Sequence, residues 1–297
     1  MKSHQIRALV QVAESGSIRG AARAMFLSQS ALTKSLRELE EDLGAELMSR
    51  SHKGVDFTAA GKVVLEHARL ALSVLDKARE EVRLLRGGAG AQVAVAVTPV
   101  LAIDALPKVW RSFERSHPDV RLALSEGFLA QLVPALLEGR LDFAVAIADA
   151  EDLPFELVFE PLAQVTAAPA ARRGHPLAQA RTWEAVADAT WVMNFSAGSQ
   201  SETFVTWLRE QGHPTPRRIV NCTSPVLMAE LMRRTDMIGY CPEALLDDAM
   251  YGAGVQRLRV KPLPPPMHLG LIQRRGVPLG RAAKALASLF VRHVKAG

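Results

Sequence analysis

The segment from Ile18 to Leu43 constrains this chain more than any other feature, because its apolar residues describe two short helices that meet at a tight corner. Its second helix carries leucines at spacings of four, three and four residues, which places them all on one side of the helix. We expect that side to be buried and Ser28 to cap the helix start. Two helices joined in this way form a helix-turn-helix. The leucines are Leu32, Leu36, Leu39 and Leu43.

The opposite face of this second helix is polar. It begins with uncharged hydrogen-bonding side chains and continues with two cations. Its members are Gln29, Ser30, Thr33, Lys34 and Arg37. Such a face is typical of a recognition helix, whose first turn meets base edges while its later residues meet phosphates. The alternative is an ordinary amphipathic hairpin in which the leucines are only core. The small residues of the first helix and the segment that follows the second favour DNA binding.

That following segment, residues 47–58, is a compact basic turn between two short extended pieces. A hairpin of this kind is typical of a DNA-binding wing, and it would lay Arg50 and Lys53 along the sugar-phosphate backbone or in the minor groove. The whole chain has a net charge of +5 and a sequence pI near 9.5, which fits a nucleic-acid partner without requiring one.

Residues 16–61 read GSIRGAARAMFLSQSALTKSLRELEEDLGAELMSRSHKGVDFTAAG and resemble the N-terminal pattern of the LysR-type transcriptional regulators. The resemblance rests on the SQSAL start of the second helix and on the GV-x-x-T-x-A-G close of the wing. Two places depart from it, Thr33 with Lys34 and Met48 with Ser49. The resemblance covers the full length, strongly to about Arg86. It implies a homodimer, commonly a homotetramer, that binds double-stranded operator DNA, responds to a small-molecule effector and acts on RNA polymerase.

Residues 59–86 contain no proline, and their apolar residues fall on alternating heptad positions. They are Leu65, Ala68, Leu72, Leu75 and Val82. We expect one long helix that pairs with its copy in a second subunit, although Arg79 interrupts the seam and a solitary surface helix is the alternative. The glycine cluster at 87–90 then breaks the helix. No Gly-Lys-Ser/Thr follows it, so it is interpreted as a hinge and not as a phosphate-binding loop.

The remaining residues alternate strand-like and helix-like runs, which indicates an α/β fold. The expected domains are an all-α winged helix-turn-helix at 1–62, a linker and dimerisation helix at 63–90 and an effector domain at 91–297. The pieces ALPKVWRSFERSHPDVRLALSEG and LVPALLEGRLDFAVAI resemble the LysR-type effector domain, whose two-subdomain fold is that of periplasmic binding proteins. We expect subdomain I at about 91–161 and 267–297 and subdomain II at about 162–266. Pro264, Pro265 and Pro266 should mark the return.

In such a fold a ligand binds between the subdomains, at the carboxyl ends of strands where helices begin. Four loops qualify, and simple helix capping by their Ser and Thr residues is the alternative. Their candidate residues are Thr98, Pro99, Val100, Gly127, Phe128, Asn194, Phe195, Ser196, Gly198, Ser199, Thr223 and Ser224. Hydroxyls and N–H groups at a helix start favour carboxylate, sulfonate or phosphate oxygens. No arginine stands near Ala146 and Ile147, so we expect a small organic acid with one negative charge, held beside Phe128 and Phe195.

Other classes of function are less well supported. The sequence contains no Gly-x-Ser-x-Gly, Cys-x-x-Cys or His-Glu-x-x-His motif, and its eight histidines are scattered singly, so we expect no enzyme, no metal and no cofactor. The N-terminal motif argues against a solute-binding protein. With no signal peptide or apolar run of membrane-spanning length, the expected location is the cytoplasm, with no membrane partner. Cys222 and Cys241 both follow strand-like segments, and a thiol redox switch is the alternative to an effector.

Overall fold

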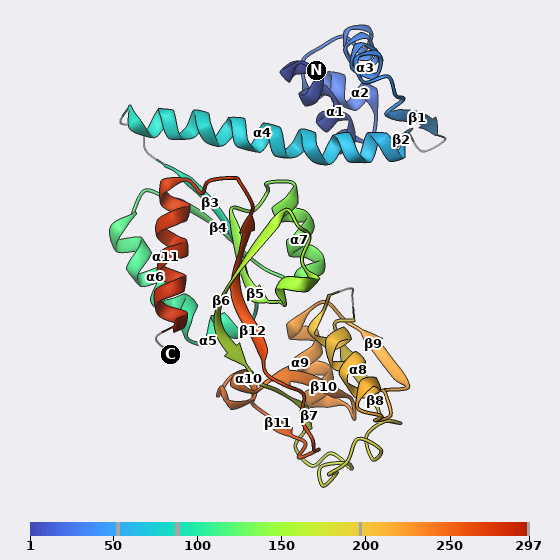
Figure 1. Ribbon diagram of the computed structural model, residues 1–297, viewed down its shortest axis with the longest axis vertical. Helices are drawn as coiled ribbons and strands as arrows, with labels where there is room; N and C mark the ends of the chain where they lie inside the picture. The colour runs from blue at the N-terminus through green and yellow to red at the C-terminus, as the bar shows by residue number, and fades with distance from the viewer. Residues whose placement is uncertain (52–53, 87–89, 196–197, 296–297) are drawn as a thin grey trace. The chain divides into compact units, whose positions relative to one another are not determined.

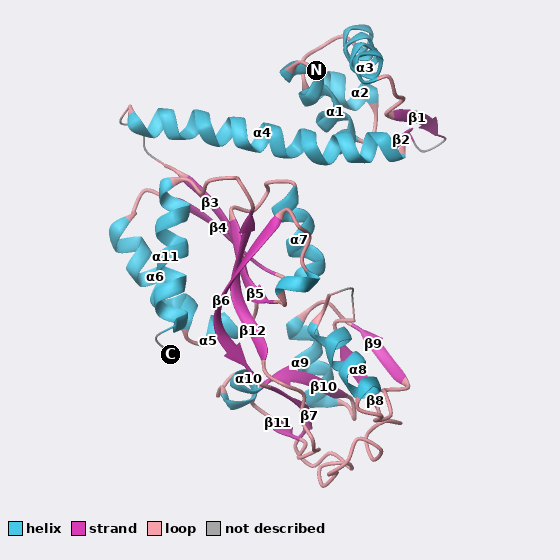
Figure 2. Ribbon diagram, in the orientation of Figure 1, coloured by secondary structure: helices cyan, strands magenta, loops and turns pink. Residues whose placement is uncertain are grey.

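The computed structural model describes residues 1–51, 54–86, 90–195 and 198–295. The chain forms two compact units, the first built mainly from residues 1–86 and the second mainly from residues 90–295. Figure 1 shows the order of helices and strands, and Figure 2 shows that helices dominate the first unit whereas the second alternates helices with strands. Each unit is described by itself.

The first unit begins with three helices, α1 (Ser3–Ser15), α2 (Ile18–Ala24) and α3 (Gln29–Leu43). The side chain of Ser17 accepts the backbone N–H of Gly20 at 3.1 Å and so caps α2. Ser28 caps α3 in the same way, accepting the N–H of Ala31 at 3.1 Å, as its position in the sequence predicts. Gly44 ends α3 in the left-handed conformation, with φ of 64°. The helix-turn-helix is confirmed.

The leucine stripe of α3 is buried over its first three members. Leu32, Leu36 and Leu39 are at most 2% exposed and pack with Leu9 of α1. The prediction of burial is wrong for the fourth member, since Leu43 is 39% exposed. Leu43 is the last residue of α3, and the chain turns directly after it at Gly44. The buried stripe is therefore one turn shorter than the spacing predicts.

The hairpin that follows is an antiparallel pair, β1 (Met48–Ser51) with β2 (Gly54–Phe57), in which Met48 pairs with Phe57. This confirms the extended pieces on either side of the basic turn. One carboxylate of α3 holds the hairpin at its base, since Glu40 Oε1 accepts the backbone N–H groups of Leu47 at 2.8 Å and Met48 at 3.3 Å. The wing is thus tied to the recognition helix by a residue of that helix.

The long helix α4 (Ala59–Leu85) follows, capped by Thr58, whose side chain accepts the N–H of Gly61 at 3.0 Å. Its expected heptad seam divides into two parts. Leu65 and Ala68 are buried in the core that α4 shares with α1 and α3, whereas Leu75 is 44% and Val82 51% exposed. Only the C-terminal half of the seam is left uncovered within one subunit.

The second unit contains two sheets of five strands each. The first sheet has the order β4-β3-β5-β12-β6, where β3, β4 and β5 are parallel and β12 is antiparallel to both of its neighbours. Its strands are β3 (Gln92–Val97), β4 (Arg121–Glu126), β5 (Phe143–Ile147), β6 (Leu157–Val165) and β12 (Met267–Arg274). Helices α6 (Ala105–Ser116) and α11 (Arg281–Lys295) lie on one side of it and α7 (Leu129–Leu137) on the other (Figure 1). Short helices α5 (Val100–Ile103) and η1 (Ala150–Asp152) complete this part.

The second sheet has the order β11-β7-β10-β8-β9. Its strands are β7 (Ala167–Arg172), β8 (Thr190–Met193), β9 (Arg218–Asn221), β10 (Ile238–Pro242) and β11 (Val255–Arg257). The helices of this part are α8 (Gln200–Glu210), α9 (Pro225–Arg234) and α10 (Glu243–Asp247). β8 is parallel to β9 and β10, and β7 is antiparallel to β10. Parallel strands alternating with helices place several strand ends and helix starts together.

The chain passes between the two sheets twice. The first crossing falls at Thr166, because β6 stays paired with β12 as far as Val165. This lies a few residues after the approximate position of 161–162 that the sequence suggested. The return lies between β11 and β12, in the non-strand segment that includes Pro264, Pro265 and Pro266, as predicted. Two crossings of this kind are the usual hinge of a two-subdomain binding fold.

Candidate DNA-binding and effector-binding sites

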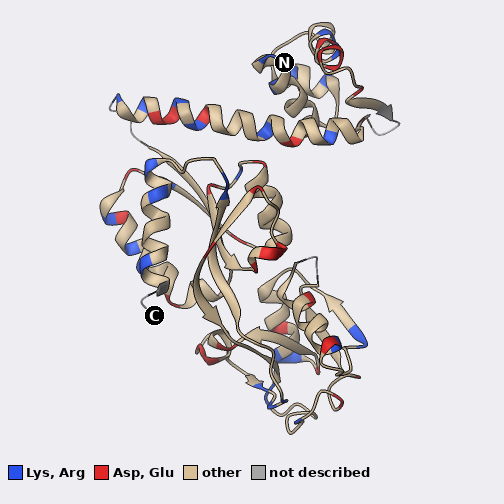
Figure 3. Ribbon diagram, viewed as in Figure 1, with Lys and Arg blue, Asp and Glu red and all other residues tan. Residues whose placement is uncertain are grey.

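The candidate DNA-binding surface is the exposed face of α3 with the wing. Gln29, Ser30, Lys34 and Arg37 are exposed, and Thr33 is half-buried with its hydroxyl donating to the carbonyl of Gln29 at 2.8 Å. The side chain of Arg50, which belongs to β1, is not described, and Lys53 lies outside the described residues. Acidic residues also lie on α3 (Figure 3), but toward its C-terminal end. The N-terminal half of the helix therefore presents only uncharged and basic side chains.

Two features of this surface were not predicted from the sequence. Phe26, at the corner between α2 and α3, is 96% exposed and has a φ of 56°, a left-handed conformation that is uncommon for an aromatic residue. An apolar ring held at the edge of the recognition helix is suited to contact a thymine methyl group or a sugar. The second feature is Glu40, which positions the wing. No sequence pattern predicts either feature, because the exposure of Phe26 and the hydrogen bonds of Glu40 to the wing both depend on tertiary packing.

The candidate effector site is a cavity in the second unit, between its two sheets, with about 1010 Å³ of space between the lining atoms, part of it open to solvent. From the expected loops it brings together Thr98, Pro99, Val100, Gly127, Phe128, Asn194 and Ser199. Ala146 and Ile147, at the end of β5, also line it. Thr98 and Asn194 are buried, at 6% and 4% exposure.

Other candidates from the same loops do not reach the cavity. Phe195 packs at the edge of the main core, and Gly198 borders a separate cavity beside Asp149, Asp152 and the three prolines. Ser224 is the N-cap of α9, where its hydroxyl accepts the N–H of Leu227 at 3.4 Å, and Thr223 is not a lining residue either. Ser224 therefore caps a helix, as in the alternative interpretation. Ser196 lies outside the described residues.

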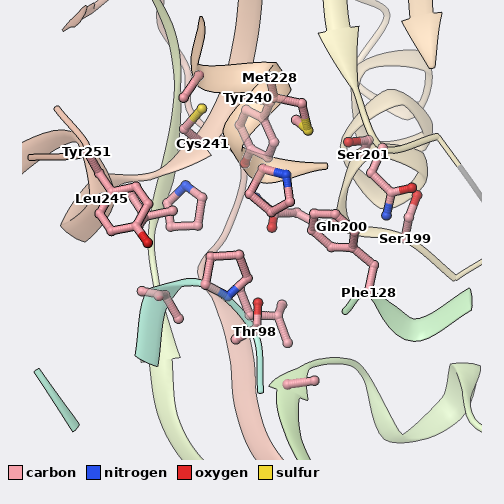
Figure 4. Close-up of a pocket in the computed structure, with 18 of the residues that line it drawn as sticks. Thr98, Phe128, Ser199, Gln200, Ser201, Met228, Tyr240, Cys241, Leu245 and Tyr251 are labelled. Carbon is pink, nitrogen blue, oxygen red and sulfur yellow. The ribbon is translucent and has the colours of Figure 1, made fainter. Parts of the chain in front are cut away.

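Much of the cavity wall comes from elements that the strand-end rule did not select. Pro225, Met228, Ala229 and Met232 line it from α9 at the spacing of one helical face, a signal that the sequence does carry. Further apolar wall comes from β10 and from the segment after it. These residues are Tyr240, Cys241, Leu245, Leu246 and Tyr251, which Figure 4 shows in part.

The start of α8 is occupied by the chain itself. The hydroxyl of Ser199 accepts the N–H of Glu202 at 3.2 Å, and the carboxylate of Glu202 accepts the N–H of Gly198 at 2.7 Å. This is a reciprocal capping arrangement. The organic acid expected here would therefore meet an internal carboxylate at the helix start, which lowers the attraction that this end of the helix has for anions.

Two ionisable groups of the wall are held in their neutral forms. Burial raises the pKa of the Cys241 thiol to about 12, and burial together with the charge of Glu243 raises the pKa of the Tyr240 phenol. Cys241 lies within β10 and not after it, a correction to the expected position, and its Sγ is 3.8 Å from Sδ of Met232. Cys222 is half-buried after β9, and its thiol donates to the carbonyl of Ser224 at 3.5 Å.

Comparison with known proteins agrees with this arrangement. Residues 3–62 match the family model of the bacterial regulatory helix-turn-helix protein, lysR family, and residues 86–295 match that of the LysR substrate binding domain. The chain belongs to the LysR family of transcriptional regulators. It is therefore a DNA-binding regulator with an effector-binding domain.

Individual relatives of this LysR-family regulator are distant. It is 29% identical to the SDS degradation transcriptional activation protein of a Pseudomonas species, over 97% of this chain and 94% of the relative. It is 28% identical to the regulator GbpR of Azospirillum brasilense, over 82% of this chain and 72% of the relative. Among solved structures, that of full-length CbnR complexed with its target DNA has a TM-score of 0.65 at 21% identity, covering 100% of this chain and 99% of that one. This likeness shows the shared fold. Every helix among the described residues is too short or too polar to span a membrane.

Proposed function

We propose that this LysR-family regulator recognises operator DNA through α3 and the wing, and that a small organic molecule in the cavity between the two sheets controls it. The observation that carries the proposal is the combination, in one chain, of an exposed polar recognition face with a largely apolar cavity between two sheets joined by two crossings. Since its target would be chromosomal DNA, we place its action in the cytoplasm.

On the DNA side, we propose that each contact residue has one of two roles. Gln29, Ser30 and Thr33 lie in the first turns of α3, where a recognition helix meets base edges. Lys34 and Arg37 follow on the same exposed face, and the wing adds Arg50 and Lys53; these four cations would bind phosphates. Phosphate contacts fix the register of the protein on the duplex, while the uncharged residues would carry base preference.

We further propose a homodimer formed through α4, assembled in pairs as a tetramer. The exposed C-terminal half of its heptad seam, which includes Leu75 and Val82, supports this step, because apolar residues repeating at this spacing are buried when two helices pair. Two recognition helices in a dimer would read two half-sites separated by about one turn of duplex, or a multiple of it.

Control by the effector would follow from the position of the cavity. A ligand that touches both sheets favours the relative arrangement in which both sets of contacts form, and a ligand with equal affinity for all arrangements would change nothing. We propose that this change is transmitted through the dimer to the DNA and to RNA polymerase. The redox alternative is less well supported, since a thiol buried as deeply as that of Cys241 forms little of the reactive thiolate.

In vitro selection from random duplex DNA by the full-length protein tests this proposal. We expect one enriched sequence with two-fold related half-sites, and about tenfold or more weaker binding of the Gln29→Ala variant, since a good base contact contributes about 1–3 kcal/mol. Gln211→Ala is the matched control, because Gln211 is exposed and belongs to the other unit. Failure to enrich any sequence, or equal losses in the two variants, would contradict the proposal.

A further inference from the structure

Among the described residues, the wall of the effector cavity is uncharged. Of the described residues that line it, none is Asp, Glu, Lys, Arg or His, and the sequence has only Ser196 and Ala197 in the adjoining stretch that the structure does not describe. An ion transferred from water into such a cavity loses its hydration without gaining a partner of opposite charge. The wall therefore disfavours the binding of any ligand that carries a net charge.

The cavity has a polar side and an apolar side. Ser199, Gln200 and Ser201 lie together at one side, and Leu245 and Tyr251 lie at the other, as Figure 4 shows. The sulfur-containing and aromatic side chains Met228, Met232 and Phe128 also line the cavity. A ligand that matches this wall has a polar group at one end and an apolar body.

The polar side offers hydrogen bonds but no positive charge. Gln200 Nε2 is buried and has no hydrogen-bond partner among the described residues, so this N–H₂ group lacks the acceptor that a buried donor needs, and a ligand oxygen reached by a rotation of the side chain would supply it. Two residues away, the carboxylate of Glu202 already caps the start of α8 by accepting the N–H of Gly198. A second carboxylate placed beside Gln200 would be repelled by Glu202, whereas a hydroxyl, carbonyl or amide oxygen would not.

We propose that the effector is an electrically neutral amphiphilic molecule, whose polar oxygen accepts a hydrogen bond from Gln200 and whose apolar body packs against the side of the cavity formed by Leu245 and Tyr251. This inference rests on the proposed function, because it assumes that the cavity is the effector site. It replaces the organic anion expected from the sequence. It excludes dicarboxylates and free amino acids, since each needs a charged partner that the described wall lacks.

Matched ligands of one carbon skeleton test the charge preference in the full-length protein. We would measure the binding of 1-octanol, octanoate, octanedioate and octylamine by ligand-observed NMR and calorimetry at pH 7.5, and repeat the series with 3-phenyl-1-propanol and 3-phenylpropanoate. The expected result is that each alcohol binds at least tenfold more tightly than its carboxylate, and that the dianion and the amine do not bind. An acid or amine that binds as tightly as the alcohol would overturn the neutral-ligand inference.

Two substitutions connect this preference with the cavity. Gln200→Lys places a cation at the polar side, and we expect it to reverse the order so that octanoate binds better than octanol. Gln211→Lys is the matched control, since it adds the same charge at the exposed end of α8 and should leave the order unchanged. If Gln200→Lys does not improve octanoate binding, the assignment of Gln200 to the polar group is wrong.

A third variant separates this inference from the proposed function. Ala229→Phe fills the cavity from α9 and should abolish binding of every ligand, whereas Val226→Phe, at a position 63% exposed on the same helix, should not. If no ligand binds the wild type, or if binding is indifferent to Ala229→Phe, the effector site itself fails and with it the proposed control. If binding is lost in Ala229→Phe but the anion is preferred in the wild type, only the neutral-ligand inference fails.

Discussion

Replacing Gly61 by alanine should loosen the DNA-binding unit, although alanine favours helices more than glycine does. Gly61 lies in the first turn of α4 with an ordinary helical backbone, and a Cβ atom there would come within 1.9 Å of the carbonyl oxygen of Leu47. That oxygen also accepts the N–H of Thr58 at 3.0 Å. Backbone cannot rotate away as a side chain does, so α4 and the chain before β1 must separate.

The expected cost combines three contributions. Overpacking against backbone is at the upper end of the usual range, about 3 kcal/mol, and weakening the hydrogen bond from Thr58 adds about 1 kcal/mol. The higher helix propensity of alanine stabilises the helix by about 1 kcal/mol relative to glycine. The net destabilisation is about 3 kcal/mol, equivalent to about a hundredfold faster hydrogen exchange in the most protected amides of α3.

Hydrogen exchange followed by mass spectrometry is the suitable assay, because the tryptophans cannot report on this unit. All four belong to the effector unit, so their fluorescence should show an unchanged unfolding transition and serves as an internal control. They are Trp110, Trp183, Trp191 and Trp207. Gly44→Ala is the matched variant, since its φ is 64° but no atom lies within 4 Å of the added Cβ, and it should cost only about 1 kcal/mol. Exchange in Gly61→Ala as slow as in the wild type would refute the steric argument.

Three further predictions concern function. Lys34→Ala should weaken binding to all DNA sequences and lower the number of ions released on binding by about one. Lys284 is an exposed lysine of the other unit, so Lys284→Ala should change neither quantity. Affinity measured across a range of salt concentrations decides between these outcomes. Leu75→Lys should raise the dimer dissociation constant at least tenfold in sedimentation experiments, since burying a leucine contributes about 1.5–3 kcal/mol, and an unchanged constant would remove α4 from the interface. Cys222 should be alkylated in the native protein, while Cys241 should react only after unfolding, because a thiol of pKa about 12 is about one part in ten thousand thiolate at pH 8. Alkylation of both thiols at the same rate, followed by mass spectrometry, would contradict the burial of Cys241.

The sequence by itself determined the helix-turn-helix, because local signals there agree with one another. The cap at Ser28 and the spacing of Leu32, Leu36 and Leu39 describe the same helix, and in the structure α3 follows Ser28 and buries these three leucines. The alternation of strands and helices in the effector unit was predictable as well, because strands such as β3 and β5 are short apolar runs. Strand ends then located part of the cavity, including Thr98, without any knowledge of distances.

Only the tertiary structure decided which residues complete each site and what charge the cavity carries. The wall formed by α9 and by the segment after β10 is brought to Thr98 and Phe128 by the crossings between the sheets, which join residues more than a hundred positions apart. The capping of α8 by Glu202 and the exposure of Leu43 likewise depend on where the chain turns. Local patterns record the preferences of neighbouring residues, whereas charge balance and exposure depend on residues that are neighbours only after folding.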